Sequence, residues 1–214
     1  MEFSQLHPPD GVYPDMTALS VLECDAQLML RVREGDEQSF ALLLEKYRTP
    51  VLQFLYRMVQ DHPVAEELAQ EVFLRVYRSR ASYTPSARFT TWLYCIATHL
   101  ALNWLRDHRN EKTQQSLDGA PDLRSWLQIA DRSSTIEQVL LHRAQAAEIR
   151  SAIQALPAKQ RAAVLMHKYQ EMDYRQIAAA LGCSESAVKS LLFRAYETLR
   201  SRLAHLVLRG GAVK

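Results

Sequence analysis

The chain has 214 residues, of which 48% are hydrophobic, and its formal net charge is +2. This composition supplies apolar material for a packed core and argues against a wholly disordered chain. The sequence contains no run of about 18 consecutive apolar residues, so we expect no membrane insertion. It begins without a basic segment followed by an apolar one, and its three cysteines form no CxxC pair. We therefore predict a cytoplasmic protein without a secretory signal or a disulfide framework.

The charge is distributed unevenly along the chain. Residues 25–110 carry 11 Lys and Arg against 10 Asp and Glu, whereas residues 136–214 carry 12 against 6. The first 24 residues carry four acidic side chains and no Lys or Arg. A basic C-terminal piece beside a nearly neutral body indicates a polyanionic partner for that piece. A solvated helical surface that favours arginine would produce the same imbalance.

Helical periodicity organises the first half of the chain, after a tail at residues 1–24. Apolar residues recur there at steps of three and four, which is the spacing of one helix face. The pattern predicts three long helices, at about residues 36–58, 63–79 and 92–105. Pro63 suits the first position of the second helix, and a bend is expected in the first helix at Pro50. Three long helices with short connections predict a helical bundle.

The second half begins after a segment in which the helical pattern fades and Gly119 and Pro121 supply turn chemistry. Periodicity then predicts four further helices, at about residues 136–156, 157–170, 174–181 and 185–206. Asp173 and Gln176 have the spacing of a capping box ahead of the third of these. The fold class is therefore all-α, with two small helical domains on a flexible linker. The predicted divisions are a tail at 1–24, a domain at 25–110, a linker at 111–135, a domain at 136–206 and a tail at 207–214.

The second domain contains the spacing of a helix-turn-helix. Ala178 is small enough for two helices to cross closely, Gly182 can adopt the left-handed conformation of the turn, and Val188 would fill the angle between the helices. In such a unit the N-terminal half of the second helix faces base edges in the major groove. The side chains predicted to do so are those of Ser186, Lys189, Ser190, Phe193 and Arg194. Lysine and arginine can bond guanine acceptors or phosphates, and phenylalanine can contact a thymine methyl group. A plain helical bundle is the alternative.

Arginines alternate with aromatic residues along residues 75–109. Arginine side chains can follow phosphates and aromatic faces accept unstacked bases, each worth roughly 1–3 kcal/mol, so this combination suits single-stranded DNA. The alternative is that aromatic residues such as Trp92 and Trp104 belong to the core. Tyr83 differs because it lies in a loop, where no core requires it. Tyr83 is close to Arg88 in the sequence, and we expect its ring to be exposed at the edge of a site for a flipped base.

Four segments together resemble the extracytoplasmic-function (ECF) class of RNA polymerase sigma factors, in the sigma-70 family. They are residues 67–78 (ELAQEVFLRVYR), residues 89–97 (FTTWLYCIA), the Leu156-Pro157 pair and the VKS run at 188–190. The resemblance covers about residues 25–206, nearly the whole chain. It implies that the two predicted domains correspond to the regions 2 and 4 of that family.

The resemblance also implies a role for particular residues. Glu67, Gln70 and Glu71 match the helix that docks on the clamp helices of the polymerase. The five helix-turn-helix residues given above match the readers of the minus-35 promoter element. The part that captures and opens the minus-10 element is matched by Tyr83, Arg88, His99, Asn103 and Arg106. The implied partners are core RNA polymerase, promoter DNA and a cognate anti-sigma factor, and no cofactor is implied.

The sequence departs from the family pattern at three positions. His99 stands where the family usually has asparagine, so the choice of base at the minus-10 element is in question. Leu191 replaces a frequent arginine and Tyr196 another basic residue, which would weaken contacts with phosphate. His99 could also make DNA binding sensitive to pH near neutrality. The alternative, which is the more common case for a histidine, is a structural role in a hydrogen bond.

Two other classes of protein remain as alternatives. A helix-turn-helix regulator that works without polymerase would share the second domain, and its first bundle would sense a ligand or dimerise. An enzyme would need reactive or metal-binding groups. His62 and Glu66 lie four residues apart on a predicted helix, a spacing that metals can use, but the sequence suggests no third ligand. We therefore expect no enzymatic activity and no metal.

Overall fold

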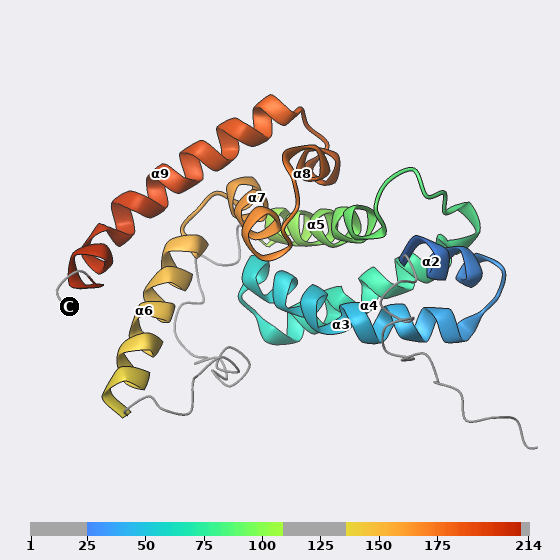
Figure 1. Cartoon of the computed structure of the whole chain (residues 1–214), viewed down its shortest axis with the longest axis horizontal. Helices are drawn as coiled ribbons and strands as arrows, with labels where there is room; N and C mark the ends of the chain where they lie inside the picture. The colour runs from blue at the N-terminus through green and yellow to red at the C-terminus, as the bar shows by residue number, and fades with distance from the viewer. Residues whose placement is uncertain (1–24, 109–135, 211–214) are drawn as a thin grey trace, which may run out of the picture.

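The computed structural model describes residues 25–108 and 136–210, and every regular element in these ranges is helical (Figure 1). The elements are α2 (Asp25–Arg33), α3 (Glu37–Val59), α4 (His62–Arg78), the 3-10 turn η1 (Arg80–Ser82), α5 (Phe89–Asp107), α6 (Ile136–Gln154), α7 (Ala158–Tyr169), α8 (Tyr174–Leu181) and α9 (Glu185–Gly210). The predicted all-α class is thereby confirmed for this part of the chain. The predicted linker at 111–135 and the tail at 1–24 lie outside the described residues, so the domain boundaries stay predictions.

Local signals in the sequence set the ends of the helix-turn-helix as predicted. Asp173 Oδ1 accepts a hydrogen bond from the backbone N–H of Gln176, and Gln176 Oε1 accepts one from the backbone N–H of Asp173, both at 2.8 Å. This is the reciprocal capping box. Gly182 follows α8 in the left-handed conformation, with φ at +61°. Ser184 Oγ then accepts from the backbone N–H of Ala187 at 3.2 Å and caps the start of α9.

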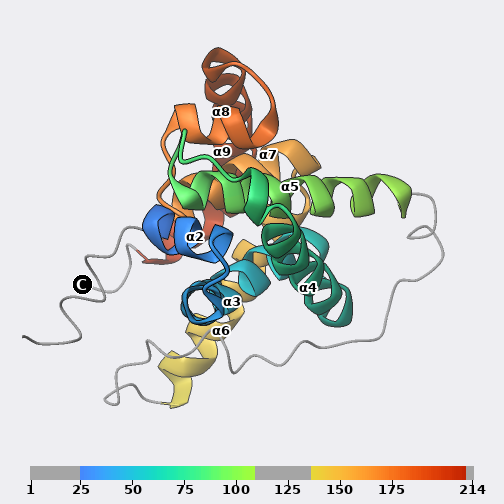
Figure 2. The same ribbon diagram turned by 90° about the vertical axis from the view of Figure 1, so that its right-hand side faces the viewer.

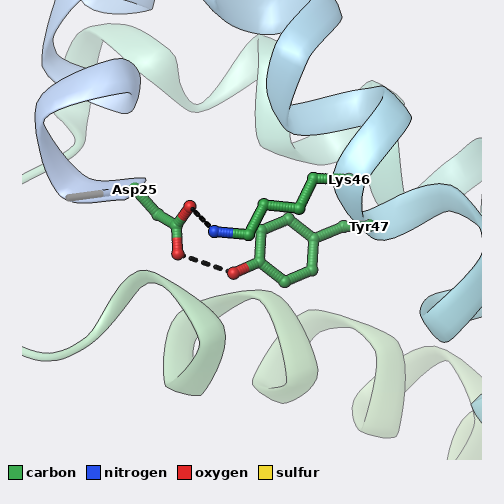
Figure 3. A network of polar contacts seen from close by, with 3 residues as sticks. All are labelled: Asp25, Lys46 and Tyr47. Carbon is green, nitrogen blue, oxygen red and sulfur yellow. Dashed lines mark hydrogen bonds and ion pairs between the residues drawn. The ribbon is translucent and has the colours of Figure 1, made fainter. Parts of the chain in front are cut away.

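Helix α2 was not predicted, because nine residues give too short a periodic pattern. Three of its residues are buried: Leu28, Met29 and Val32. Its first residue, Asp25, accepts hydrogen bonds from Lys46 Nζ and Tyr47 Oη of α3, both at 2.6 Å (Figure 3). These bonds fix the start of α2 on the longer helix. Pro50 lies inside α3, which continues to Val59.

The first half, α2 to α5, packs around large apolar side chains. Phe54 of α3 is fully buried and meets Tyr94 of α5 edge to face, with ring centroids 5.2 Å apart. The second half packs α7 against α8 and α9, and α9 runs back along α6. Figure 2 shows α5 between α7 and α8 on one side and α3 and α4 on the other. The buried residues of both halves form one contiguous core.

No helix in residues 25–108 or 136–210 has the length and apolar character needed to cross a membrane.

Candidate nucleic-acid and polymerase interfaces

The five predicted minus-35 readers all lie exposed on the N-terminal half of α9: Ser186, Lys189, Ser190, Phe193 and Arg194. Phe193 is 66% exposed, the largest exposed fraction among the exposed large apolar side chains of the described residues. The opposite face of the same turns carries Val188 and Leu192, which are buried against α8 and α7. Because residues three and four apart share one helix face, burial of this apolar pair turns the polar set outward.

A small polar and aromatic cluster lies beside these readers. Lys189 Nζ is 5.9 Å from the ring centroid of Tyr174, at the outer limit of a cation–π contact. The Tyr174 ring stacks on His167, with centroids 5.7 Å apart. Tyr196 Oη lies 3.0 Å from His167 Nδ1. Burial raises the pKa of the Tyr196 hydroxyl, which keeps it neutral. Tyr196, one of the departures from the family pattern, therefore has a structural role between α7 and α9.

The α5 residues predicted to recognise the minus-10 element lie on one exposed strip. His99, Asn103 and Arg106 are spaced by four and three positions and are exposed. Arg106 Nε also lies 3.0 Å from the carboxylate of its neighbour Asp107. Arg88, just before α5, is exposed as well. The spacing and exposure of this strip are compatible with contact along a nucleic-acid strand.

His99 also has a neighbour on its own helix. Its Nδ1 atom lies 3.6 Å from the sulfur of Cys95, one turn earlier. Cys95 is half-buried, and this burial raises the pKa of its thiol. The thiol is therefore protonated at neutral pH and can act as a weak hydrogen-bond donor to the imidazole.

Tyr83 does not lie where we expected it. Its side chain is only 4% exposed, with ring centroids 5.0 Å from Trp92 and 6.5 Å from Phe89. Its backbone carbonyl also accepts a hydrogen bond from Arg33 Nη1 at 3.4 Å. The expectation that Tyr83 is exposed was therefore wrong, because the loop after η1 folds onto the first turns of α5. A contact between Tyr83 and DNA stays a prediction, and it requires this loop to move.

The residues predicted to bind polymerase lie on α4. Glu67 and Gln70 are exposed, whereas Glu71 is half-buried. Glu71 Oε1 accepts a hydrogen bond from Arg75 Nε at 2.7 Å, one turn along the helix. This ion pair leaves Glu67 and Gln70 as the more available side chains for a partner.

An open groove of about 910 Å³ runs between α3 and α4, next to Gln70. Its apolar wall comprises Phe40, Ala41, Leu44, Leu52, Ala69, Phe73, Leu74 and Tyr77. Glu37, Arg48 and Glu66 add charged groups to the lining. Leu74 is 47% exposed and forms part of this apolar lining. Sequence reasoning missed this groove, although Leu74 is an apolar residue off the periodic core pattern.

The pair of side chains that suggested a metal is an exposed contact in the first turn of α4. His62 Nδ1 and Glu66 Oε1 are 3.6 Å apart, and both side chains are more than half exposed. The part of the chain that the structure describes holds no group of three or more His, Cys, Asp or Glu able to bind a metal ion.

Two family models match the chain. The model of Sigma-70 region 2 matches residues 43–111, and that of Sigma-70, region 4 matches residues 146–199. Two solved structures show a similar fold: CnrH in complex with the cytosolic domain of CnrY, and the sigma factor RpoE in complex with the anti-sigma factor NepR from Bartonella quintana. Their TM-scores are 0.64 and 0.60 at 17% and 20% identity. The first similarity covers 86% of this chain and 99% of CnrH, the second 78% and 98%.

Curated relatives are similar over most of the sequence. RNA polymerase sigma-H factor of Pseudomonas aeruginosa is 32% identical, with 86% of this chain and 96% of that protein covered. The ECF RNA polymerase sigma factor SigW of Bacillus subtilis is 30% identical, with 82% and 95% covered. The ECF RNA polymerase sigma-E factor of Escherichia coli (strain K12) is 29% identical, with 86% and 97% covered. These similarities, together with the matches to regions 2 and 4, place the chain in the ECF group of the sigma-70 family of RNA polymerase sigma factors.

Proposed function

We propose that this protein binds core RNA polymerase, recognises the minus-10 and minus-35 promoter elements and promotes DNA opening at the start of transcription. The observation that carries the proposal is the presence of both sigma regions, in order, in one chain. Each region also presents an exposed set of side chains suited to nucleic acid. In a regulator that works without polymerase the first bundle would sense a ligand or dimerise, and neither role requires the match to Sigma-70 region 2.

The second region would grip duplex DNA at the minus-35 element. The N-terminal half of α9 enters the major groove, where Lys189 and Arg194 bond guanine acceptors or phosphates. Phe193 contacts a thymine methyl group, while Ser186 and Ser190 bond base edges or backbone. The exposure of these side chains, the capping box at the start of α8 and the left-handed Gly182 of the turn support this assignment.

The first region would hold bases of one strand at the minus-10 element after the strands separate. Arg88 and Arg106 follow the phosphates, and His99 and Asn103 face the unstacked bases. Tyr83 joins them once its loop moves. Binding energy for the single-stranded form offsets the cost of unpairing, so opening is a shift of population. No covalent step is involved, which is why we propose no enzymatic activity, and the protein acts in the cytoplasm beside the polymerase.

Helix α4 would dock on the polymerase. Glu67, Gln70 and Glu71 provide a polar face, and the apolar groove beside them can receive large side chains from a partner helix. CnrH and RpoE were solved with CnrY and the anti-sigma factor NepR, respectively. We propose that this chain too has an anti-sigma partner, which would hold it inactive.

Transcription from a promoter library by polymerase reconstituted with the purified protein tests the proposal. Transcripts should start only when the protein and core polymerase are both present, and the enriched sequences should share two elements at the minus-10 and minus-35 positions. Core polymerase alone is the control. Binding of an operator without polymerase, together with no transcript in its presence, would instead favour the stand-alone regulator.

A further inference from the structure

Helix α2 lies outside the residues that match Sigma-70 region 2, which begin at residue 43. It nevertheless packs against η1 and α5, the elements on either side of the Tyr83 loop, as well as against α3 (Figure 1). Its last residue, Arg33, donates a hydrogen bond from Nη1 to the backbone carbonyl of Tyr83 at 3.4 Å, across 50 positions of the sequence. This bond ties α2 to the loop that joins η1 to α5.

The loop is held against the fold through Tyr83. Within residues 81–88 only Tyr83 is buried, and the others are exposed. Its ring packs on Trp92 and Phe89, and its backbone carbonyl is the group that Arg33 binds. Before the Tyr83 ring can reach a base, both the packing of the ring and this hydrogen bond must be lost.

Helix α2 is itself firmly seated. Three of its apolar side chains are buried, and at its start Asp25 accepts a hydrogen bond from Tyr47 Oη at 2.6 Å (Figure 3). The centroid of the Tyr47 ring lies 5.4 Å from that of Phe89, one of the rings packed on Tyr83. Both ends of α2 are thus connected to the aromatic cluster that contains Tyr83, and Arg33 binds the loop from a well-packed helix.

We propose that Arg33 is a positioning residue of the minus-10 site, which holds the Tyr83 loop against α5 until a melted strand is captured. This inference rests on the proposed function. Arg33 is exposed and its bond is long, so the bond is weak enough to break when the loop moves. The apparent affinity of a protein whose competent form is only partly populated falls by that fraction. The Arg33 bond therefore lowers the fraction of the protein that is ready to capture the strand.

Hydrogen–deuterium exchange of the full-length protein measures the loop without DNA. The backbone N–H of Tyr83 donates to the Arg80 carbonyl at 3.2 Å, so its exchange reports opening of the loop. Arg33→Ala should speed exchange of residues 82–88 about threefold, because the loss of one exposed hydrogen bond makes opening only modestly easier. Exchange in α3 and α4 should stay as in the wild type. Arg33→Lys keeps a donor and should restore slower exchange.

Promoter opening with core polymerase is the second measurement. Permanganate reactivity of promoter thymines should develop about threefold faster with Arg33→Ala than with the wild type, because more of the protein has a released loop. A direct contact of Arg33 with DNA would produce the opposite change. Arg31→Ala is the matched control, since it removes the same charge from an exposed position about 200° away around the same helix. It should change neither measurement.

The two measurements together decide the proposal. Unchanged loop exchange in Arg33→Ala would overturn it, and so would faster exchange throughout α2 to α5, which would indicate a general loss of stability. Faster loop exchange with unchanged or slower promoter opening would also overturn it, provided that the wild type transcribes. Faster loop exchange without any transcript from the wild type would refute the proposed function and leave the restraint of the loop by Arg33 standing.

Discussion

The two surfaces proposed to contact DNA differ in how their side chains are positioned. On α9 the five predicted readers come from one helix, within nine consecutive residues, and the turn before them contains the left-handed Gly182 and Ser184, which caps the start of α9. In the first region they come from a loop and from α5, and the loop residue Tyr83 is buried among aromatic rings. The proposed minus-35 surface is fully exposed as it stands, whereas the proposed minus-10 surface would have to rearrange before all its members could reach a base.

This difference agrees with what each surface is proposed to bind. Duplex DNA has a regular groove, so a rigid helix can be complementary to it in advance. A melted strand exists only after the bases unpair, and a loop that moves with them can couple its own rearrangement to that event. The rearrangement would take place at the aromatic cluster around Tyr83.

Replacing the buried loop aromatic should have the largest effect. Tyr83→Ala removes a ring that is packed on Trp92 and Phe89, and we expect it to lower the free energy of unfolding by about 3 kcal/mol. It should also impair open-complex formation more than polymerase binding, as measured by permanganate reactivity of promoter thymines. Tyr83→Phe keeps the ring and should retain the stability. If a folded Tyr83→Ala protein opens promoter DNA normally, the role of Tyr83 is purely structural.

Substitutions on the α9 surface should lower the affinity for promoter DNA without changing the stability of the protein. Lys189→Ala combined with Arg194→Ala should weaken promoter binding by about a hundredfold, since each specific contact is worth about 1–3 kcal/mol. Loss of the minus-35 footprint of the holoenzyme would report this change, with thermal unfolding unaltered. Arg202→Ala, an exposed arginine farther along α9, is the control. If the double variant protects the minus-35 element as well as the wild type does, neither residue contacts that element.

Polymerase docking should be affected less strongly. Glu67→Lys together with Gln70→Ala changes two exposed side chains of α4 beside the apolar groove, and we expect about tenfold weaker association with core polymerase. A pull-down titration with core polymerase measures this association. Glu34→Ala alters an exposed acidic residue that does not line the groove and should bind normally. Equal retention of the double variant and the wild type would contradict this docking face.

The smallest expected effect tests the turn that makes the α9 surface rigid. Gly182 has φ at +61°, and a Cβ built there has no neighbouring heavy atom within 4 Å. Gly182→Ala therefore costs only the left-handed conformation, about 1 kcal/mol, or roughly 2–4 °C in Tm for a chain of this size. Gly182→Asn should lose less, because asparagine tolerates this conformation better. If both variants lose the same stability, the cause is a steric clash rather than the left-handed backbone conformation.

Features encoded by neighbouring residues could be predicted from the sequence. The capping box of Asp173 and Gln176, the left-handed Gly182 and the outward face of α9 all follow from short spacings. These signals act within a few residues and need no knowledge of distant packing. The family resemblance, carried by several such segments in order, was confirmed by the comparisons.

Features that depend on distant residues were missed. Helix α2 is stabilised by its contacts with α3, and the burial of Tyr83 depends on Trp92 and Phe89 from another element. The groove between α3 and α4 and the hydrogen bond from Arg161 to the Met58 carbonyl join segments that only the tertiary fold brings together. A loop aromatic was therefore taken as exposed, because its partners lie beyond the range of any local pattern.

The bonds that hold the start of α2 have a practical consequence for shortened forms of the protein. Asp25 accepts from Lys46 and Tyr47 of α3, and the first 24 residues precede this carboxylate (Figure 3). A truncation that begins at or before Asp25 preserves both bonds. One that begins a few residues later would release the N-terminal turn of α2 and uncover the apolar side chains beneath it.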